Sequence, residues 1–156
     1  MDETLPVIYY QRHLESVVPM SLLSRKGLLA IAAVVDIALH GQTRPVSAKA
    51  LAARNALPPR HLEPVLQALV REGILKGTRG PRGGYELGRD RRRITAEDIL
   101  RAAHSLDDQP GPSVPHSALL DQVVLPAVAQ AERAFAAALA EINIEDLATR
   151  THQTEQ

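Results

Sequence analysis

The amino-acid sequence predicts a mainly α-helical protein with one small β-hairpin. Hydrophobic residues make up 45% of the 156 residues but aromatic residues only 3%, so the core must be built from aliphatic side chains, a composition that favours helices. Apolar residues recur every three or four positions along most of the chain, as they do on one face of a helix. The period changes over residues 74–88, where a glycine-rich turn separates two short strands.

The first predicted helix spans residues 24–40. Ser24 is expected to cap its free amides, and Gly41 to end it in the left-handed conformation. Helical spacing assigns its buried face to Leu28, Ile31, Ala32, Val35 and Leu39.

Two further helices follow at short intervals. Ser47 is placed to cap a short helix that runs through Arg54. The next helix begins near Pro59, whose missing N–H is not needed in a first turn, and ends at Gly73. Its apolar face consists of Leu62, Val65, Leu66, Leu69 and Val70. Pro64 within it removes a backbone hydrogen bond at a cost of about 3 kcal/mol, so we expect a bend or an irregular first turn.

The segments "ILKG" and "GYELG" are predicted to pair as a hairpin with the tip "TRGPRG". "ITAEDILRAAH" then predicts a helix in which Thr95 and Asp98 form a capping box. The breaker-rich stretch "DDQPGPSVP" predicts a linker.

Beyond the linker, the sequence predicts a long helix with an apolar stripe that suits pairing with a second copy. The stripe contains many small residues, which let two helices approach closely: Leu120, Val123, Ala127, Ala131, Phe135, Ala138 and Ile142. Pro126 is expected to kink this helix or to mark a new start. The last 14 residues are polar and are expected to be frayed.

Three helices, of which the second and third are joined tightly, followed by a hairpin, predict a winged helix-turn-helix domain with a long C-terminal dimerisation helix. The expected divisions are an N-terminal extension over 1–20, the winged domain over 21–104, a linker over 105–118, the dimerisation helix with a short terminal helix over 119–148, and a polar tail over 149–156.

Charge is distributed unevenly although the whole chain is neutral. Residues 58–93 hold nine Lys or Arg against four Asp or Glu, a balance of +5, while residues 94–156 hold three against ten, a balance of −7. Such asymmetry is typical of a nucleic-acid contact. In a helix-turn-helix the second helix of the pair lies in the DNA major groove, and the hairpin forms the wing.

The predicted DNA contacts fall in three places: Arg25 and Lys26 at the start of the first helix, Arg60, His61, Glu63 and Gln67 on the third, and Arg79 and Arg82 at the hairpin tip. For the third-helix residues, a solvated helix face is the alternative. Cations at a helix start oppose its dipole, which supports a phosphate role for the first pair. The arginines of 91–93 are a phosphate clamp or, as we favour slightly, a solvated charge run.

The segments "LLSRKGLLAIAAVVDIALHG", "RGPRGGYELG" and "ITAEDILRA", in this order, resemble the Rrf2 family of bacterial transcriptional regulators, which includes the iron-sulfur cluster assembly regulator. The resemblance implies a homodimer that binds a partly palindromic operator, most often as a repressor. Sensing members hold an iron-sulfur cluster with three cysteines before the long helix, whereas this chain contains no cysteine. We therefore expect no cofactor and no metal site, although a small-molecule effector near residues 107–115 is open.

Other classes of protein find little support. The chain lacks His-Glu-x-x-His, a Walker phosphate loop and a nucleophile elbow, so we do not expect an enzyme. His104 and His116 flank Asp107 and Asp108, but so loose a spacing predicts no metal site. With no secretory signal and no apolar run long enough to span a membrane, a cytoplasmic protein without a membrane partner is expected. The rival function is a winged-helix module that binds another protein rather than DNA.

Overall fold

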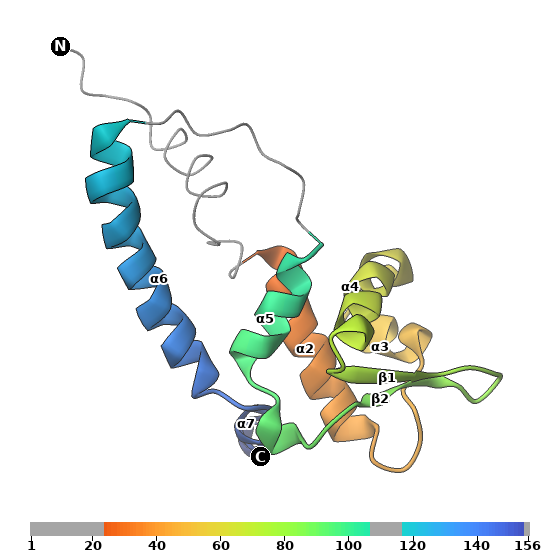
Figure 1. The fold of residues 1–156 in the computed structure, drawn as a ribbon. Helices are drawn as coiled ribbons and strands as arrows, with labels where there is room; N and C mark the ends of the chain where they lie inside the picture. Colours follow the sequence, from red (N-terminus) through yellow and green to blue (C-terminus); the bar gives the residue numbers. More distant parts are fainter. Residues whose placement is uncertain (1–23, 107–116, 155–156) are drawn as a thin grey trace.

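The computed structural model of the protein describes residues 24–106 and 117–154 (Figure 1). In chain order its elements are α2 (Arg25–His40), α3 (Ala48–Arg54), α4 (Pro59–Arg71), β1 (Leu75–Thr78), β2 (Gly84–Leu87), the 3-10 turn η2 (Arg91–Arg93), α5 (Ala96–His104), the π-helical turn η3 (Leu120–Val124), α6 (Leu125–Ala140) and α7 (Ile144–Thr154). The predicted fold class, mainly helical with one antiparallel hairpin, is confirmed.

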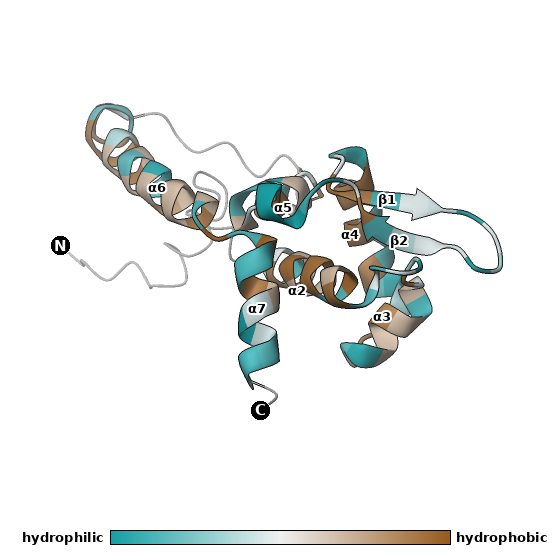
Figure 2. Cartoon of the chain, turned by 90° about the horizontal axis from the view of Figure 1, so that it is seen from below, coloured by the Kyte–Doolittle hydropathy of each residue, from teal (hydrophilic) through white to brown (hydrophobic). Residues whose placement is uncertain are grey.

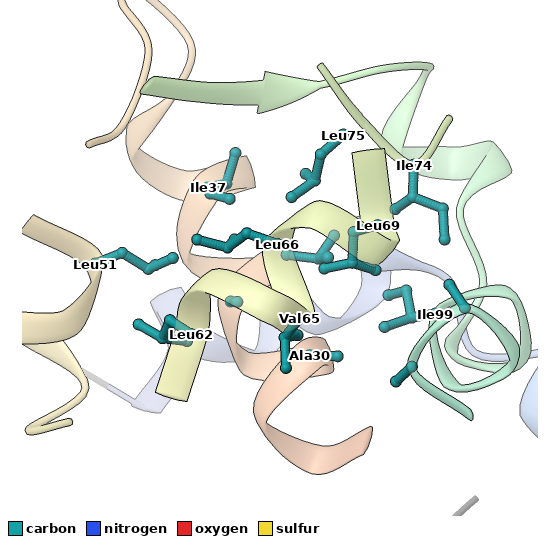
Figure 3. Packing of buried hydrophobic residues seen from close by; sticks show 14 of the residues in the cluster. Ala30, Ile37, Leu51, Leu62, Val65, Leu66, Leu69, Ile74, Leu75 and Ile99 are labelled. Carbon is teal, nitrogen blue, oxygen red and sulfur yellow. The ribbon is translucent and has the colours of Figure 1, made fainter. Parts of the chain in front are cut away.

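The core lies where α2, α4 and α5 meet, with β1 and α7 closing it (Figure 3). The predicted apolar face of α4 is confirmed, because Leu62, Val65, Leu66 and Leu69 are buried and Val70 packs against them in part. The helix is continuous through Pro64, and Gly73 follows its end with a positive φ of 72°. The capping box of Thr95 and Asp98 at the start of α5 is also confirmed.

The buried face predicted for α2 is correct in part, because Ile31 and Val35 pack against the core, and wrong for Leu28 and Ala32. The helix buries Ala30, Ala33, Val34 and Ile37, whereas Leu28 is 55% exposed and Ala32 is also exposed. Residues 28–35 are all apolar, so helical spacing fits several faces of this segment, and packing against α4 and α5 selects one of them. Ser24 caps α2 as expected, but Gly41 has a φ of −91° and is not left-handed.

A buried carboxylate fixes α3 against α2. Asp36, which is 8% exposed, accepts hydrogen bonds from Arg54 Nε at 3.0 and 3.1 Å and from Arg54 Nη2 at 2.6 Å. The Asn55 side-chain amide adds a donor at 3.3 Å. The hydrogen bonds that Arg54 donates to Asp36 raise the pKa of Arg54, which stays charged. This ion pair sets the orientation of the first helix of the helix-turn-helix.

The hairpin is anchored at its base and free at its tip. Its strands pair in the register Leu75 with Leu87 through Thr78 with Gly84. Val46, in the loop before α3, adds a short antiparallel bridge to Tyr85, with reciprocal N–H to O distances of 2.9 and 2.8 Å. A Cβ on Gly84 would lie 2.4 Å from the Val46 carbonyl oxygen, so only glycine permits this close approach.

The C-terminal helices behave differently from each other. The π-helical turn η3 runs directly into α6, so the helix is continuous here and the new start predicted at Pro126 is not seen; the change from π to α geometry falls one residue before Pro126, which has no N–H to donate. Figure 1 shows α6 extending away from the winged domain on the side opposite the hairpin, and none of its residues is buried. By contrast, α7 returns to the domain, where Ile144 and Ala148 are buried.

The frayed end predicted for the last 14 residues is therefore wrong over Ile144–Thr154, which forms a helix. Burial of two residues on one face stabilises a segment that is otherwise polar. The Ala96 N–H donates to the Ile142 carbonyl, and the Ile144 N–H donates to the Ile94 carbonyl, so α7 joins the domain directly beside α5. Most of the predicted linker, residues 107–116, lies outside the described residues.

Candidate nucleic-acid interface

The wing tip, residues 79–83, carries two arginines whose side chains make, among the described residues, no hydrogen bond or ion pair that supports the fold. Arg79 and Arg82 lie beyond the last strand pair, Thr78 with Gly84, and both are exposed. Neither makes a side-chain hydrogen bond or ion pair to the part of the chain that the structure describes. The tip is the hydrophilic end of the hairpin in Figure 2. Two cations held away from the core on a projecting loop are available to an external anion.

The third predicted helix is α4, which we call the reading helix, and the four contact residues predicted on it all lie on its outer face. Arg60, His61, Glu63 and Gln67 are exposed, while the positions between them are largely buried in the core. The N-cap position, Pro58, provides no side-chain hydrogen bond to the first turn. The structure therefore presents the start of α4, with its partial positive charge, to solvent together with these side chains.

Arg25 and Lys26 come close to the start of α4. Both are exposed in the first turn of α2, and they line the same hollow as Arg60 and His61, which we call the α2–α4 hollow. The structure thus brings two of the three predicted contact groups together. The wing arginines lie apart from this hollow, as do Glu63 and Gln67.

A further cation was missed by sequence reasoning. Arg44, in the loop between α2 and α3, lines a groove opposite Pro81, Arg82 and Gly83 of the wing tip. This wing groove has a volume of about 840 Å³, and Arg54 also lines it. Arg44 is exposed, and its side chain has no partner among the described residues. The sequence shows only a basic residue in the loop "GQTRPV". It does not show that this loop lies beside the wing, because the Val46–Tyr85 bridge that holds it there is a tertiary contact.

Several arginines on the α5 and α7 side of the molecule are held by acids. Arg101 pairs with Glu97 and Asp98, Arg89 with Asp98 at 3.6 Å, and Arg91 with Glu145. The bond to Glu97 raises the pKa of Arg101. Arg91 therefore helps to hold α7 rather than standing free as part of a charge run.

The predicted dimerisation stripe lies on an uncovered helix. Leu120 and Ile142 are half-buried, Ile142 lies just past the end of α6, and the other members of the stripe are exposed, including Phe135 at 37% and Val123 at 58%. By length and composition alone, Leu120–Ala140 could cross a membrane, and none of it is buried in the protomer.

These features define a winged helix-turn-helix domain of the DNA-binding class, extended by a long exposed helix. The comparisons with known proteins agree. The family model described as "Rrf2: Iron-dependent Transcriptional regulator" matches residues 23–150. The chain belongs to the Rrf2 family.

Its relatives are regulators of transcription. The HTH-type transcriptional regulator IscR of Xenorhabdus nematophila is 38% identical over 80 residues, which cover 51% of this chain and 49% of that protein. The match thus spans about half the length of this relative. The protein slr0846 of Synechocystis, named as an HTH-type transcriptional regulator, is 36% identical over 126 residues, 80% of this chain and 86% of the relative. The solved structure of T. potens IscR has a TM-score of 0.68 at 27% identity and covers 86% of this chain and 90% of that chain.

The residues of this chain do not fit a cysteine-held iron centre. The sequence contains no cysteine, so thiolate ligands for a cluster are absent. Within residues 24–106 and 117–154, no three His, Asp or Glu side chains gather in a way that could hold a metal ion. His116, Asp107 and Asp108 lie outside the described residues.

Proposed function

We propose that the protein is a homodimeric, sequence-specific DNA-binding repressor that recognises a partly palindromic operator. The observation that carries the proposal is a set of exposed arginines that form no ion pair with the described residues: Arg79 and Arg82 on the wing tip, Arg60 on the reading helix and Arg25 at the start of α2. Family membership supports the same conclusion.

In this proposal, α4 lies in the major groove. Arg60, His61 and Glu63 are exposed in its first two turns, the part of a reading helix that reaches base edges. Arg60 has the geometry to pair with guanine through two hydrogen bonds, and Glu63 to accept from a cytosine amino group. The wing tip and Arg44 would hold the flanking phosphates, while Arg25 and Lys26 hold a phosphate beside α4.

The dimer would form through α6. Small residues along its exposed stripe allow a close approach of two helices, and a second copy would bury Phe135 and Val123. Glu132 and Arg133 lie in the middle of this helix, where each would cost about 3 kcal/mol at the centre of a bilayer. We therefore assign the helix to a protein partner and the regulator to the cytoplasm. Two-fold symmetry would place the two reading helices in major grooves about 34 Å apart.

Repression would be relieved by a small-molecule effector rather than by an iron-sulfur cluster, because the chain has no thiolate ligands. The expected place for this effector is between the winged domain and the dimer helix.

Binding to random and genomic duplex DNA tests the proposal. Fluorescence anisotropy against a random duplex should show affinity that falls steeply with salt, as phosphate neutralisation requires. Sequencing of genomic fragments retained by the purified protein should then return a two-fold symmetric motif. An absence of duplex binding at low salt and high micromolar protein would refute the proposal and favour a module that binds another protein.

A further inference from the structure

The α2–α4 hollow has the size and lining of a small-molecule site. Its volume is about 900 Å³, and natural ligand sites range from about 300 to 1,000 Å³. It opens between the start of α2, the start of α4 and the end of α5. Much of its wall is apolar and is provided by Leu28, Leu57, Pro64 and Leu106.

Leu28 is the least expected of these residues. It exposes 55% of its surface, yet it stands in the first turn of α2 beside two cationic residues. It contributes nothing to the core, which α2 forms with its opposite face. Contact with phosphates alone would need no apolar wall at this position.

The hollow is also lined by basic residues. Arg25, Lys26, Arg60 and His61 contribute to the lining, and no acidic side chain does so among the described residues. Arg25 and Arg60 form no ion pair within the described chain. An occupant would therefore meet both positive charge and aliphatic carbon, a combination that favours a molecule with an anionic head and an apolar body.

We propose that the α2–α4 hollow binds a small amphipathic carboxylic acid and that this ligand and DNA exclude one another. The carboxylate would lie against Arg25 and Arg60, and the apolar body against Leu28 and Leu57. The exclusion rests on the proposed function, in which the same two arginines hold DNA. The ligand would be an inducer that occupies part of the DNA-binding surface itself. Leu106, where the described winged domain ends, places the hollow at the start of the linker to the long helix.

Calorimetry with decanoate tests the site without reference to DNA. We expect saturable binding of one decanoate per protomer, with 1-decanol and acetate each at least about tenfold weaker, because each offers only one of the two required parts. Failure of decanoate to saturate, or equal binding of 1-decanol, would overturn the proposal.

Two substitutions separate the hollow from non-specific binding. Ala32 also lines the hollow, is exposed and is not one of the proposed DNA contacts. Ala32→Phe should therefore fill the hollow and abolish decanoate binding while leaving DNA affinity and the thermal melt unchanged. Thr149→Phe, on the exposed face of α7, is the matched control and should bind decanoate normally. Leu28→Ser removes apolar wall at an exposed position and gives the same test if Ala32→Phe does not fold. Decanoate binding that survives Leu28→Ser would contradict the assignment.

Competition between decanoate and DNA tests the second part of the proposal, which is that the two exclude one another. At a decanoate concentration ten times its dissociation constant, the apparent Kd of the dimer for DNA should rise about 120-fold, because both hollows must be empty and each contributes a factor of about eleven. An unchanged DNA affinity under saturating decanoate would overturn the exclusion. If the protein alone does not bind duplex DNA, the proposed function fails and the exclusion with it, while calorimetry still decides whether the hollow holds the acid.

Discussion

Replacing Arg79 and Arg82 together by alanine isolates the role of the wing. Both side chains are exposed at the wing tip and have no partner among the described residues, so the fold loses no contact. Exposed substitutions of this kind change the free energy of unfolding by no more than about 0.5 kcal/mol. The thermal melt and the oligomeric state should therefore be unchanged, while retention of operator DNA in a gel shift should be lost.

The size of the DNA effect follows from counting phosphates. Each neutralised phosphate contributes about −0.9 to the slope of log K against log salt concentration. A dimer that lacks both arginines in each protomer loses four contacts, so the slope should become shallower by about 3.6. Between about 50 and 200 mM salt, the variant should lose about 150-fold less affinity than the wild type does.

The control removes equal charge from another face. Arg101→Ala with Arg150→Ala takes two exposed arginines from α5 and α7, and it should lower affinity only slightly and leave the slope nearly unchanged. Anisotropy titrations of a fluorescent duplex at several salt concentrations measure all three proteins. A double wing variant with the wild-type slope, or a control with the same change in slope, would show that the wing does not grip phosphates.

Three other predictions test the parts that hold the interface. Gly84→Ala should lower stability by about 1–3 kcal/mol in denaturant unfolding, because the added Cβ would lie 2.4 Å from the Val46 carbonyl oxygen. Gly77→Ala should be close to neutral, because its Cβ would lie 3.9 Å from the Tyr85 ring, an ordinary van der Waals contact. Asp36→Asn should cost about 1–3 kcal/mol by the same measurement, since Arg54 loses its charge-assisted partner but remains partly solvated; a double-mutant cycle without coupling would contradict the ion pair. Phe135→Glu should convert the dimer to monomers in sedimentation velocity and weaken operator binding, and an unchanged sedimentation coefficient would rule out pairing through this part of α6.

The sequence predicted the parts of the fold that local signals determine. Ser24, Ser47 and Thr95 each cap the helix they were expected to cap, because the N-cap hydrogen bond lies within three residues. The hairpin was also predicted from a local signal, since its glycine-rich tip and the change of period lie within one short segment.

Tertiary contacts decided what the sequence could not. The uninterrupted apolar run of α2 left its buried face undetermined, so Leu28 was expected in the core and is instead exposed at the α2–α4 hollow. The α7 helix is stabilised by burial of Ile144 and Ala148 against parts of the domain that are distant in the sequence. The two misplaced features thus share one cause, which is packing between segments that periodicity alone does not bring together.

The same distinction explains how a chain with no net charge presents a basic surface. Periodicity and composition record the total of 18 basic and 18 acidic residues but not which of them meet. In the fold, Glu97, Asp98 and Glu145 neutralise arginines on the α5 and α7 side, and Asp36 neutralises Arg54 inside the helix-turn-helix. Arg44, Arg60, Arg79 and Arg82, which lie on the reading helix, at the wing tip and in the loop beside it, form no ion pair with the described residues. Because folding pairs the acids with arginines elsewhere, the field at the wing and reading helix exceeds what the sequence total suggests, and a duplex would meet it as it approaches.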